Sequence, residues 1–484
     1  MKTKKKLACI YVALILAVCL IPFVGMTKFR TDETTENKTL ASFPSLMTDG
    51  QVNLAFFDEL SEYFEDHFAF REILVNVDAE IQSRIFQVSN VDTVIAGENG
   101  WLYYSATLDD YLGQNLLSER AIYATAHNLS LIQTCVEEQG AKFAVTVAPN
   151  KNSLYGENMP YYDSYVVSEE KNADHLQAAL AEEGVTYVDL FSLFKEQDEI
   201  LYLKRDSHWN NKGAVLVYNE LLSVLDVSHD VFETVRAVRT KTEIGDLNSM
   251  IYPLTSEPEW NYSYEYETKY SYVTDTESVE DSWIETENSQ GEGSLLMFRD
   301  SFGNTLLPLM ANTFSSAYFS KEEPYGLSQY MEAYSPEVVI VEKAERNISD
   351  FAETPPVMED IKTEITGEIA ETPDETTCEV GESEVDTSYL SVNGTLDESA
   401  AGTETQVYIV LSQGEAQTVY EAFLVISEES EYGYQLYISL DSLAEICGES
   451  SGEIELSVLT EQDGSLSRVH TETVNMDPYL SEEE

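Results

Sequence analysis

The sequence predicts an α/β domain on a parallel sheet, placed between an N-terminal membrane helix and a C-terminal acidic, all-β module of sandwich type. Three observations predict this arrangement. Nearly continuous apolar runs of strand length alternate with amphipathic helical patterns in the middle of the chain, as is typical of strands buried on both faces of a parallel sheet. An apolar stretch follows a cluster of lysines at the N-terminus. The last part of the chain combines short alternating runs with a complete lack of Lys and Arg between Lys362 and Arg468.

The N-terminus divides at its apolar stretch. Residues 1–6 contain four lysines, residues 7–26 are predominantly apolar, and Lys28 and Arg30 follow. A helix needs about 20 apolar residues to span a bilayer, whereas a cleaved signal peptide usually has a shorter apolar region and a small-residue cleavage site. We therefore expect a cytoplasmic tail, one transmembrane signal anchor in the cell membrane, and an extracytoplasmic remainder that starts with a linker at residues 27–50. A cleaved signal peptide is the alternative.

The α/β domain is expected over residues 51–351. Apolar runs predict strands at 143–148, 185–190, 294–298 and 338–341. Helical periodicity predicts helices at 57–68, 122–136, 175–183 and 214–225. Strands that alternate with helices favour an α/β sheet.

A segment rich in Tyr and Trp, residues 252–287, interrupts this alternation. The spacing of Tyr262, Tyr264 and Tyr266 is strand-like and predicts an inserted β-hairpin. An aromatic surface on which sugar rings stack is the alternative, and it could flank a site formed by the motifs on either side.

The acidic C-terminal part is expected to form a linker or first strands at residues 352–400 and a β module at 401–484. Alternating runs predict strands at 389–392, 406–411, 422–426, 435–440 and 454–459. A spacer or packing role is the simplest interpretation of this module. Cys378 and Cys447 could pair, although their spacing does not establish a disulfide.

The net charge of -61 makes nucleic-acid binding improbable, because such a field repels phosphate backbones. The sequence shows no zinc-site spacing, phosphate-binding loop, dinucleotide fingerprint or calcium loop. We therefore expect neither a cofactor nor a bound metal.

Two short motifs supply the parts of an activated serine: Asp-Ser-His-Trp-Asn at 206–210 and Arg-Asp-Ser-Phe-Gly at 299–303. Acyl transfer needs a nucleophile, a base and a group that orients the base. Asp206, two residues before His208, can reach the imidazole Nδ1. Ser301 follows an expected buried strand and precedes a helix, where the amides of Ser301 and Gly303 could stabilise an oxyanion.

Helix capping explains the same residues without any catalysis. Asp206 or Ser207 could cap the helix at 214–225, and Asp300 or Ser301 could cap the helix that follows them. His208 could be a structural residue held by Trp209, and Arg299 could form a surface pair with Asp300. From spacing alone, capping and catalysis both remain open.

The two motifs, together with further blocks in a consistent order, resemble the SGNH-hydrolase-like domain shared by alginate O-acetyltransferases and Gram-positive DHHW proteins. The other blocks lie at 36–44, 66–71, 100–103 and 149–151, so that the resemblance covers residues 35–350. It implies a three-layer SGNH-type fold with Ser301 as nucleophile, His208 as base and Asp206 as the orienting carboxylate. Ser207 stands where the DHHW name implies a second histidine. The further candidates for the oxyanion or substrate site are Gly303, Arg299, Asn150, Lys151 and Trp209.

The resemblance implies an extracytoplasmic, serine-dependent O-acetyltransferase or esterase that acts on a cell-surface polysaccharide or envelope glycan. Because acetyl-CoA is cytoplasmic, it also implies a multi-pass membrane acyltransferase as the partner that delivers the acetyl group. The alternative is a non-catalytic, membrane-anchored protein that binds glycan or assists envelope assembly on a degenerate hydrolase scaffold.

Overall fold

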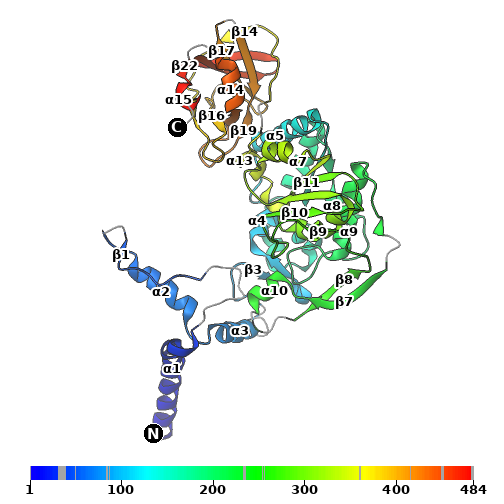
Figure 1. Ribbon diagram of the computed structural model, residues 1–484. Coiled ribbons are helices and arrows are strands. Elements are labelled where there is room, and N and C mark those ends of the chain that lie inside the picture. The colour runs from blue at the N-terminus through cyan, green and yellow to red at the C-terminus, as the bar shows by residue number, and fades with distance from the viewer. Residues whose placement is uncertain are drawn as a thin grey trace.

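The computed structural model describes residues 2–30, 40–48, 51–82, 86, 88–232, 236–252, 254, 257–358, 361–414, 416–448 and 452–480. The first four residues of the block at 36–44, and residues 31–39 and 49–50 of the expected linker, lie outside these ranges. Figure 1 shows a projecting N-terminal helix, a central α/β body, and a β module at the opposite end.

The N-terminal helix α1 (Lys2–Phe29) contains the expected apolar stretch. Its segment Ile10–Phe29, with a mean hydropathy of 2.5, is long and apolar enough to cross a membrane, a test that a signal sequence also passes. Two helices follow, α2 (Phe56–His67) and α3 (Arg71–Ile81). Stacking of Phe29 on Phe70, with ring centroids 5.3 Å apart, joins α1 to the start of α3.

A seven-stranded sheet forms the centre of the α/β domain. Its strands are β5 (Lys142–Ala148), β6 (Tyr187–Val188), β9 (Ser271–Tyr272), β10 (Trp283–Glu287), β11 (Ser294–Phe298), β12 (Ser316–Ser320) and β13 (Val338–Ala344). The order is β6-β5-β13-β11-β12-β10-β9. The first five of these strands are parallel, and β10 and β9 are antiparallel additions at one edge. The strands predicted from apolar runs are all present, although the one expected at 185–190 is reduced to β6.

Helices cover both faces of this sheet. In β11, Leu295 and Met297 belong to one apolar cluster, whereas Leu296 and Phe298 belong to another, because successive side chains point to opposite faces. The first cluster includes residues of α8 (Leu190–Lys195), α9 (Asn211–Val224) and α11 (Leu307–Thr313). The second includes residues of α5 (Glu119–Glu138), α7 (Asn172–Glu182) and α12 (Leu327–Tyr334). Burial on both faces explains why the central strands are continuously apolar.

The hairpin expected within residues 252–287 is confirmed only in part, because β9 and β10 pair antiparallel in the main sheet but the strand that contains Tyr262 and Tyr264 pairs outside the segment. Strand β8 (Glu259–Tyr264) pairs with an upstream strand, β7 (Ala237–Glu243), and Trp283 lies in the main sheet. The pairing sets cations against aromatic rings, since Arg239 lies opposite Tyr262 and its guanidinium lies 5.1 Å from the Trp260 ring. Such cross-strand contacts stabilise the ribbon.

The C-terminal module contains two sheets around a shared apolar core. Its strands are β14 (Ile369–Glu371), β15 (Glu379–Glu382), β16 (Tyr389–Thr395), β17 (Gln406–Gln413), β18 (Ala416–Glu421), β19 (Phe423–Val425), β20 (Gly433–Ser439), β21 (Glu453–Gln462) and β22 (Ser465–Asn475). One sheet has the order β14-β22-β21-β17-β18 and the other β15-β16-β20-β19. All five predicted runs lie in strands, and helix α14 (Leu440–Cys447) was not predicted. Cys378 and Cys447 are both free.

Helix α5 joins the module to the α/β domain. Arg120 donates hydrogen bonds to the carbonyls of Thr403 and Thr405, at 3.0 and 2.8 Å. Asn128 donates to the carbonyl of Leu424 at 2.8 Å and accepts from its N–H at 2.9 Å. The module is therefore fixed to the domain by buried polar contacts as well as by apolar packing.

Shorter elements complete the described chain: β1 (Met47–Thr48), β2 (Gln51–Val52), β3 (Val94–Ala96), β4 (Leu102–Tyr104), α4 (Leu108–Leu112), α6 (Lys151–Tyr155), α10 (Asp246–Ile251), α13 (Asp350–Glu353) and α15 (Asp477–Leu480).

Candidate active site

Ser301 lies just beyond the carboxyl end of β11, where ligands collect in parallel sheets. The chain turns there into one 3₁₀ turn, Phe302–Thr305, followed by α11. Asp300 braces this turn, since its carboxylate accepts hydrogen bonds from the N–H groups of Phe302 and Ala344, both at 2.8 Å. The turn is thereby tied to the end of the neighbouring strand β13, which holds Ser301 at the edge of the sheet.

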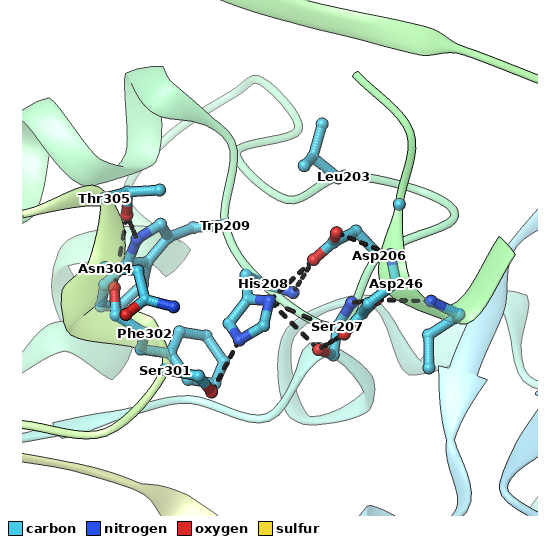
Figure 2. A network of polar contacts seen from close by, with 12 residues as sticks. Leu203, Asp206, Ser207, His208, Trp209, Asp246, Ser301, Phe302, Asn304 and Thr305 are labelled. Atoms are coloured by element: carbon cyan, nitrogen blue, oxygen red, sulfur yellow. Dashed lines mark hydrogen bonds and ion pairs between the residues drawn. The ribbon is translucent and has the colours of Figure 1, made fainter. Parts of the chain in front are cut away.

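His208 reaches Ser301 from the loop that precedes α9. Its Nε2 lies 2.8 Å from Ser301 Oγ, and its Nδ1 lies 2.8 Å from Asp206 Oδ1 (Figure 2). The same carboxylate oxygen accepts the backbone N–H of His208 at 2.9 Å, which fixes the loop as well as the ring. With the carboxylate on Nδ1, that nitrogen carries a proton and Nε2 is left to accept one from the serine.

The contact between Asp206 and His208 shifts the pKa values of these two residues in opposite directions. Burial lowers the pKa of His208, but the hydrogen bond and charge of Asp206, helped by Asp246 and Asp300, outweigh it and hold that pKa above its usual range. Burial raises the pKa of Asp206, but its contacts with His208 outweigh burial and leave that pKa lowered. The carboxylate is therefore ionised when the imidazole loses or gains its proton.

Asp246, at the start of α10, is a second carboxylate behind the imidazole that the sequence did not reveal. It accepts hydrogen bonds from both the hydroxyl and the N–H of Ser207, the latter at 2.8 Å, and donates its own N–H to Asp206 Oδ2 at 3.0 Å. Its Oδ2 lies 3.8 Å from His208 Nδ1. Burial and the charge of Asp206 raise the pKa of Asp246. An aspartate at a helix start looks like any cap, so no sequence signal distinguished it.

Asp206, His208 and Asp246 together could also hold a cation, because one ligand atom from each lies within 4.8 Å of the others. Metal binding through Nδ1 would require that nitrogen to lose its proton and its hydrogen bond to Asp206. The hydrogen bonds present favour orientation of the imidazole over coordination.

Lys151 supports the loop from behind and is only 4% exposed. Its ammonium donates to the carbonyls of Leu203, Lys204 and Asp206, at 3.2, 3.1 and 2.5 Å. An ammonium has three protons, so these contacts leave none for a substrate. Burial lowers the pKa of Lys151 to about 8, against the opposing effect of Asp206 and other carboxylates.

Asn150 is also placed away from Ser301. Its amide donates to Asp110 Oδ2 and its backbone N–H donates to Glu345 Oε2, both at 2.8 Å. These buried contacts fix the chain where β5 ends and α6 begins. The structure therefore gives Asn150 and Lys151 supporting positions and does not bring either to the serine.

The three other predicted residues surround the serine turn. Arg299 is buried and donates to Asn304 Oδ1 and to the carbonyl of Val279. Gly303 allows this close approach, since a Cβ there would lie 2.7 Å from the Cβ of Arg299. Trp209 donates its indole N–H to Thr305 Oγ1 at 2.6 Å, and its ring lies 4.8 Å from that of Phe302.

Residues 94–290 match the family model described as SGNH hydrolase-like domain, acetyltransferase AlgX. This region contains Asp206 and His208 and ends before Ser301. A curated relative, named "Probable alginate O-acetylase AlgJ", from Pseudomonas syringae pv. tomato, is 24% identical over 268 residues, which are 51% of this chain and 61% of the relative. The chain thus matches less than two thirds of that relative's length.

Solved structures with a similar chain trace include a DHHW family protein from Eubacterium siraeum, with a TM-score of 0.40, 16% identity, and coverage of 53% of this chain and 93% of the other. For PatB1 of Bacillus cereus the TM-score is 0.43, with 16% identity and coverage of 53% and 96%. The O-acetyltransferase domain of AlgJ from Pseudomonas putida gives a TM-score of 0.36, with 15% identity and coverage of 53% and 92%. As the motifs predicted, residues 94–290 are similar to the SGNH hydrolase-like domain of the AlgX acetyltransferase type.

Proposed function

We propose that this protein is a serine-dependent O-acetyltransferase, or an esterase, that acts on a polysaccharide of the cell envelope outside the cytoplasm. The observation that carries the proposal is the continuous chain of hydrogen bonds from Asp206 through His208 to Ser301. The family match supports acetyl transfer, and the name of the curated relative supports a polysaccharide as the substrate class. Helix α1 would hold the domain at the membrane.

In the first half-reaction, Ser301 Oγ attacks the carbonyl carbon of the donor's acetyl ester and its proton passes to His208 Nε2. Asp206 stabilises the resulting imidazolium. The oxyanion of the tetrahedral intermediate would accept hydrogen bonds from the N–H groups of Ser301 and Gly303, at the start of the 3₁₀ turn. The intermediate then expels the donor's oxygen, which takes the proton from Nε2, and the acetyl group remains on Ser301.

In the second half-reaction, a sugar hydroxyl gives its proton to Nε2 while its oxygen attacks the acetyl carbon. Collapse of the second intermediate releases the acetylated sugar, and Ser301 Oγ recovers the proton. Water in place of the sugar would release acetate, which is the esterase outcome. A multi-pass membrane acyltransferase is the proposed source of the acetyl group, because acetyl-CoA is cytoplasmic.

Acetate release from an aryl acetate by the detergent-solubilised full chain tests this proposal. Ser301→Ala should lower kcat/KM by about a thousandfold or more, since removal of a nucleophile has effects of that order. Ser192→Ala is the matched control, because Ser192 is an exposed serine on α8 of the same domain. Equal rates for Ser301→Ala and the wild type would sink the assignment.

A non-catalytic, glycan-binding role is the second candidate. The exposed Trp260, which lies under the guanidinium of Arg239 on the β7–β8 ribbon, favours it as a surface for sugar rings. Glycan binding by Ser301→Ala, combined with no acetyl turnover by the wild type on any envelope polymer, would support this second role.

A further inference from the structure

A cavity of about 420 Å³ lies next to the serine turn. Three elements line it: the start of α9 with Asn211, the turn and α11 with Asn304 and Pro308, and the end of β8 with Tyr264 and the following Tyr266. This volume is within the range of about 300 to 1,000 Å³ that is usual for ligand pockets. We call this cavity the tyrosine groove.

The tyrosine groove is lined by residues that directly follow each of the two motifs, Asn211 after the first and Asn304 after the second. Asn304 is three residues after Ser301, and its N–H donates to the Ser301 carbonyl at 3.2 Å. Asn304, labelled in Figure 2, thus belongs to the turn that carries Ser301, and its side-chain amide accepts from Arg299 and donates to Glu280. Asn211 is three residues after His208 and begins α9. A ligand in the groove would therefore lie beside the two segments that carry Ser301 and His208.

The two tyrosines form a rigid wall. Each is half-buried and packs edge-on against Phe232, with ring centroids 5.7 Å away for Tyr264 and 5.3 Å away for Tyr266. Rings that are held in this way lose little conformational entropy when a ligand binds. Ser263 and Thr268 add exposed hydroxyls to the same groove. An aromatic wall beside exposed hydroxyls suits a sugar, whose C–H face packs on rings while its hydroxyls form hydrogen bonds.

The charge of the groove narrows the class of sugar. Its lining consists of Asn, Ala, Val, Ser, Tyr, Thr, Pro and Leu side chains and contains no Lys or Arg. The chain as a whole carries a net charge of -61, so it repels polyanions. A polymer of uronate units would meet this field without a cation to bind its carboxylates, whereas a neutral glycan would not be repelled.

We propose that the tyrosine groove binds the acetyl acceptor and that this acceptor is a neutral glycan. One sugar ring packs on Tyr264 and Tyr266 and presents a hydroxyl to the acetylated Ser301. The proposal rests on the proposed function, since it names the acceptor of the second half-reaction.

Blocking the groove tests the proposal without removing any packing. Thr268→Trp adds an indole at an exposed groove residue, and Thr242→Trp makes the same change at an exposed residue of β7 outside the groove. The full chain is assayed with an aryl acetate as donor, with an oligomer of N-acetylglucosamine as the neutral acceptor and an oligomannuronate as the anionic one. Acetylated oligosaccharide is measured separately from free acetate.

We expect Thr268→Trp to reduce transfer to the neutral oligosaccharide by about tenfold or more and to leave aryl acetate hydrolysis within about twofold. Thr242→Trp should change neither rate. The wild type should transfer to the neutral oligomer at least about tenfold faster than to the uronate. Normal transfer by Thr268→Trp would overturn the groove as the acceptor site, and preference for the uronate would overturn the neutral class.

A binding measurement distinguishes failure of the groove proposal from failure of the proposed function. If the wild type showed no serine-dependent turnover, calorimetric titration of the full chain with the neutral oligomer would still test the groove. Binding that is lost in Thr268→Trp and kept in Thr242→Trp supports it. Binding that is equal in both variants, or absent in the wild type, overturns it. Tyr266→Leu is the second variant, and its unfolding curve shows whether the Phe232 contact was needed for folding.

Discussion

The two segments that meet at the candidate site each contain an aspartate, and only one of these aspartates contacts the imidazole. Asp206 accepts the N–H groups of His208 and Asp246 and also the ring Nδ1. Asp300 accepts the N–H groups of Phe302 and Ala344, and in the described part of the chain it has no hydrogen bond to His208. The first aspartate contacts the proposed base, and the second holds the turn that carries the proposed nucleophile.

This difference shows that capping and catalysis are not exclusive explanations of one residue. Asp206 binds backbone N–H groups as a cap does, and those bonds are what keep its carboxylate in line with the ring. Asp300 has the same backbone role without a ring to orient. What separates the two is the neighbouring histidine, whose position depends on tertiary packing of the loop against Lys151.

Of the variants that test the different roles of Asp206 and Asp300, a substitution of Asp206 is expected to have the largest effect. Asp206→Asn should lower kcat for aryl acetate hydrolysis by about 10⁴-fold, because an amide stabilises neither the required tautomer nor the imidazolium. Steady-state kinetics on the full chain measures this, with Asp198→Asn as the control at an exposed aspartate of the same domain. A loss below about tenfold would mean that Asp206 serves only as a cap.

The next largest effect is expected at Lys151, which supports the loop that contains Asp206. Lys151→Met keeps the length of the buried stem but leaves the carbonyls of Leu203 and Asp206 without their donor, whereas the Lys204 carbonyl keeps the N–H of Leu102 at 2.9 Å. Each of these two buried carbonyls, left unpaired, costs about 1 to 3 kcal/mol, so the free energy of unfolding should fall by about 2 to 6 kcal/mol. Denaturant unfolding measures it. An unchanged midpoint would show that the loop does not depend on the ammonium, and Lys195→Met is the control at an exposed lysine.

Periodicity and apolar runs predicted the central sheet because its strands are buried on both faces, as in β5, β11 and β13. They also predicted the position of Ser301, which follows from the end of β11. Strand β7 was missed because its residues are mostly polar and its partner is the aromatic strand β8. Pairing partners of exposed ribbons depend on cross-strand contacts that local pattern does not encode.

The site was predictable only in part. A separation of 93 positions along the chain does not show how close His208 and Ser301 lie in space. The motifs became informative only through their resemblance to a family. Lys151 was a candidate for the oxyanion or substrate site because it lies in a block that resembles the family, whereas the carbonyls that bind it lie 52 to 55 residues further along the chain. Asp246 carried no signal at all. These partners are set by how loops pack, which is a property of the folded chain.

A smaller effect, mainly on the free energy of unfolding, is expected for a substitution of Asp300. Asp300→Asn keeps one acceptor oxygen but turns the other into a donor that faces a backbone N–H, so one of the bonds to Phe302 and Ala344 is lost. The free energy of unfolding should fall by about 1 to 3 kcal/mol. The activity of the folded fraction should fall far less than in Asp206→Asn, because His208 keeps its carboxylate. Paired unfolding and kinetic measurements decide this, and an activity loss equal to that of Asp206→Asn would erase the distinction between the two aspartates.

The smallest effect is expected at Asp246, which acts on the base only from a distance. The reaction needs neutral His208, so activity falls as pH drops through the pKa of that imidazole. Burial alone would lower this pKa, but Asp206, Asp246 and Asp300 raise it, which places the acid limb above the usual range for histidine. Asp246→Asn removes one of these charges and should move the acid limb to lower pH, with kcat at the plateau reduced by about tenfold or less as Ser207 loses a partner. A pH profile of kcat/KM for Asp246→Asn, compared with Asp198→Asn, measures the shift. A limb that moved to higher pH, or did not move, would show that the second carboxylate does not act on His208.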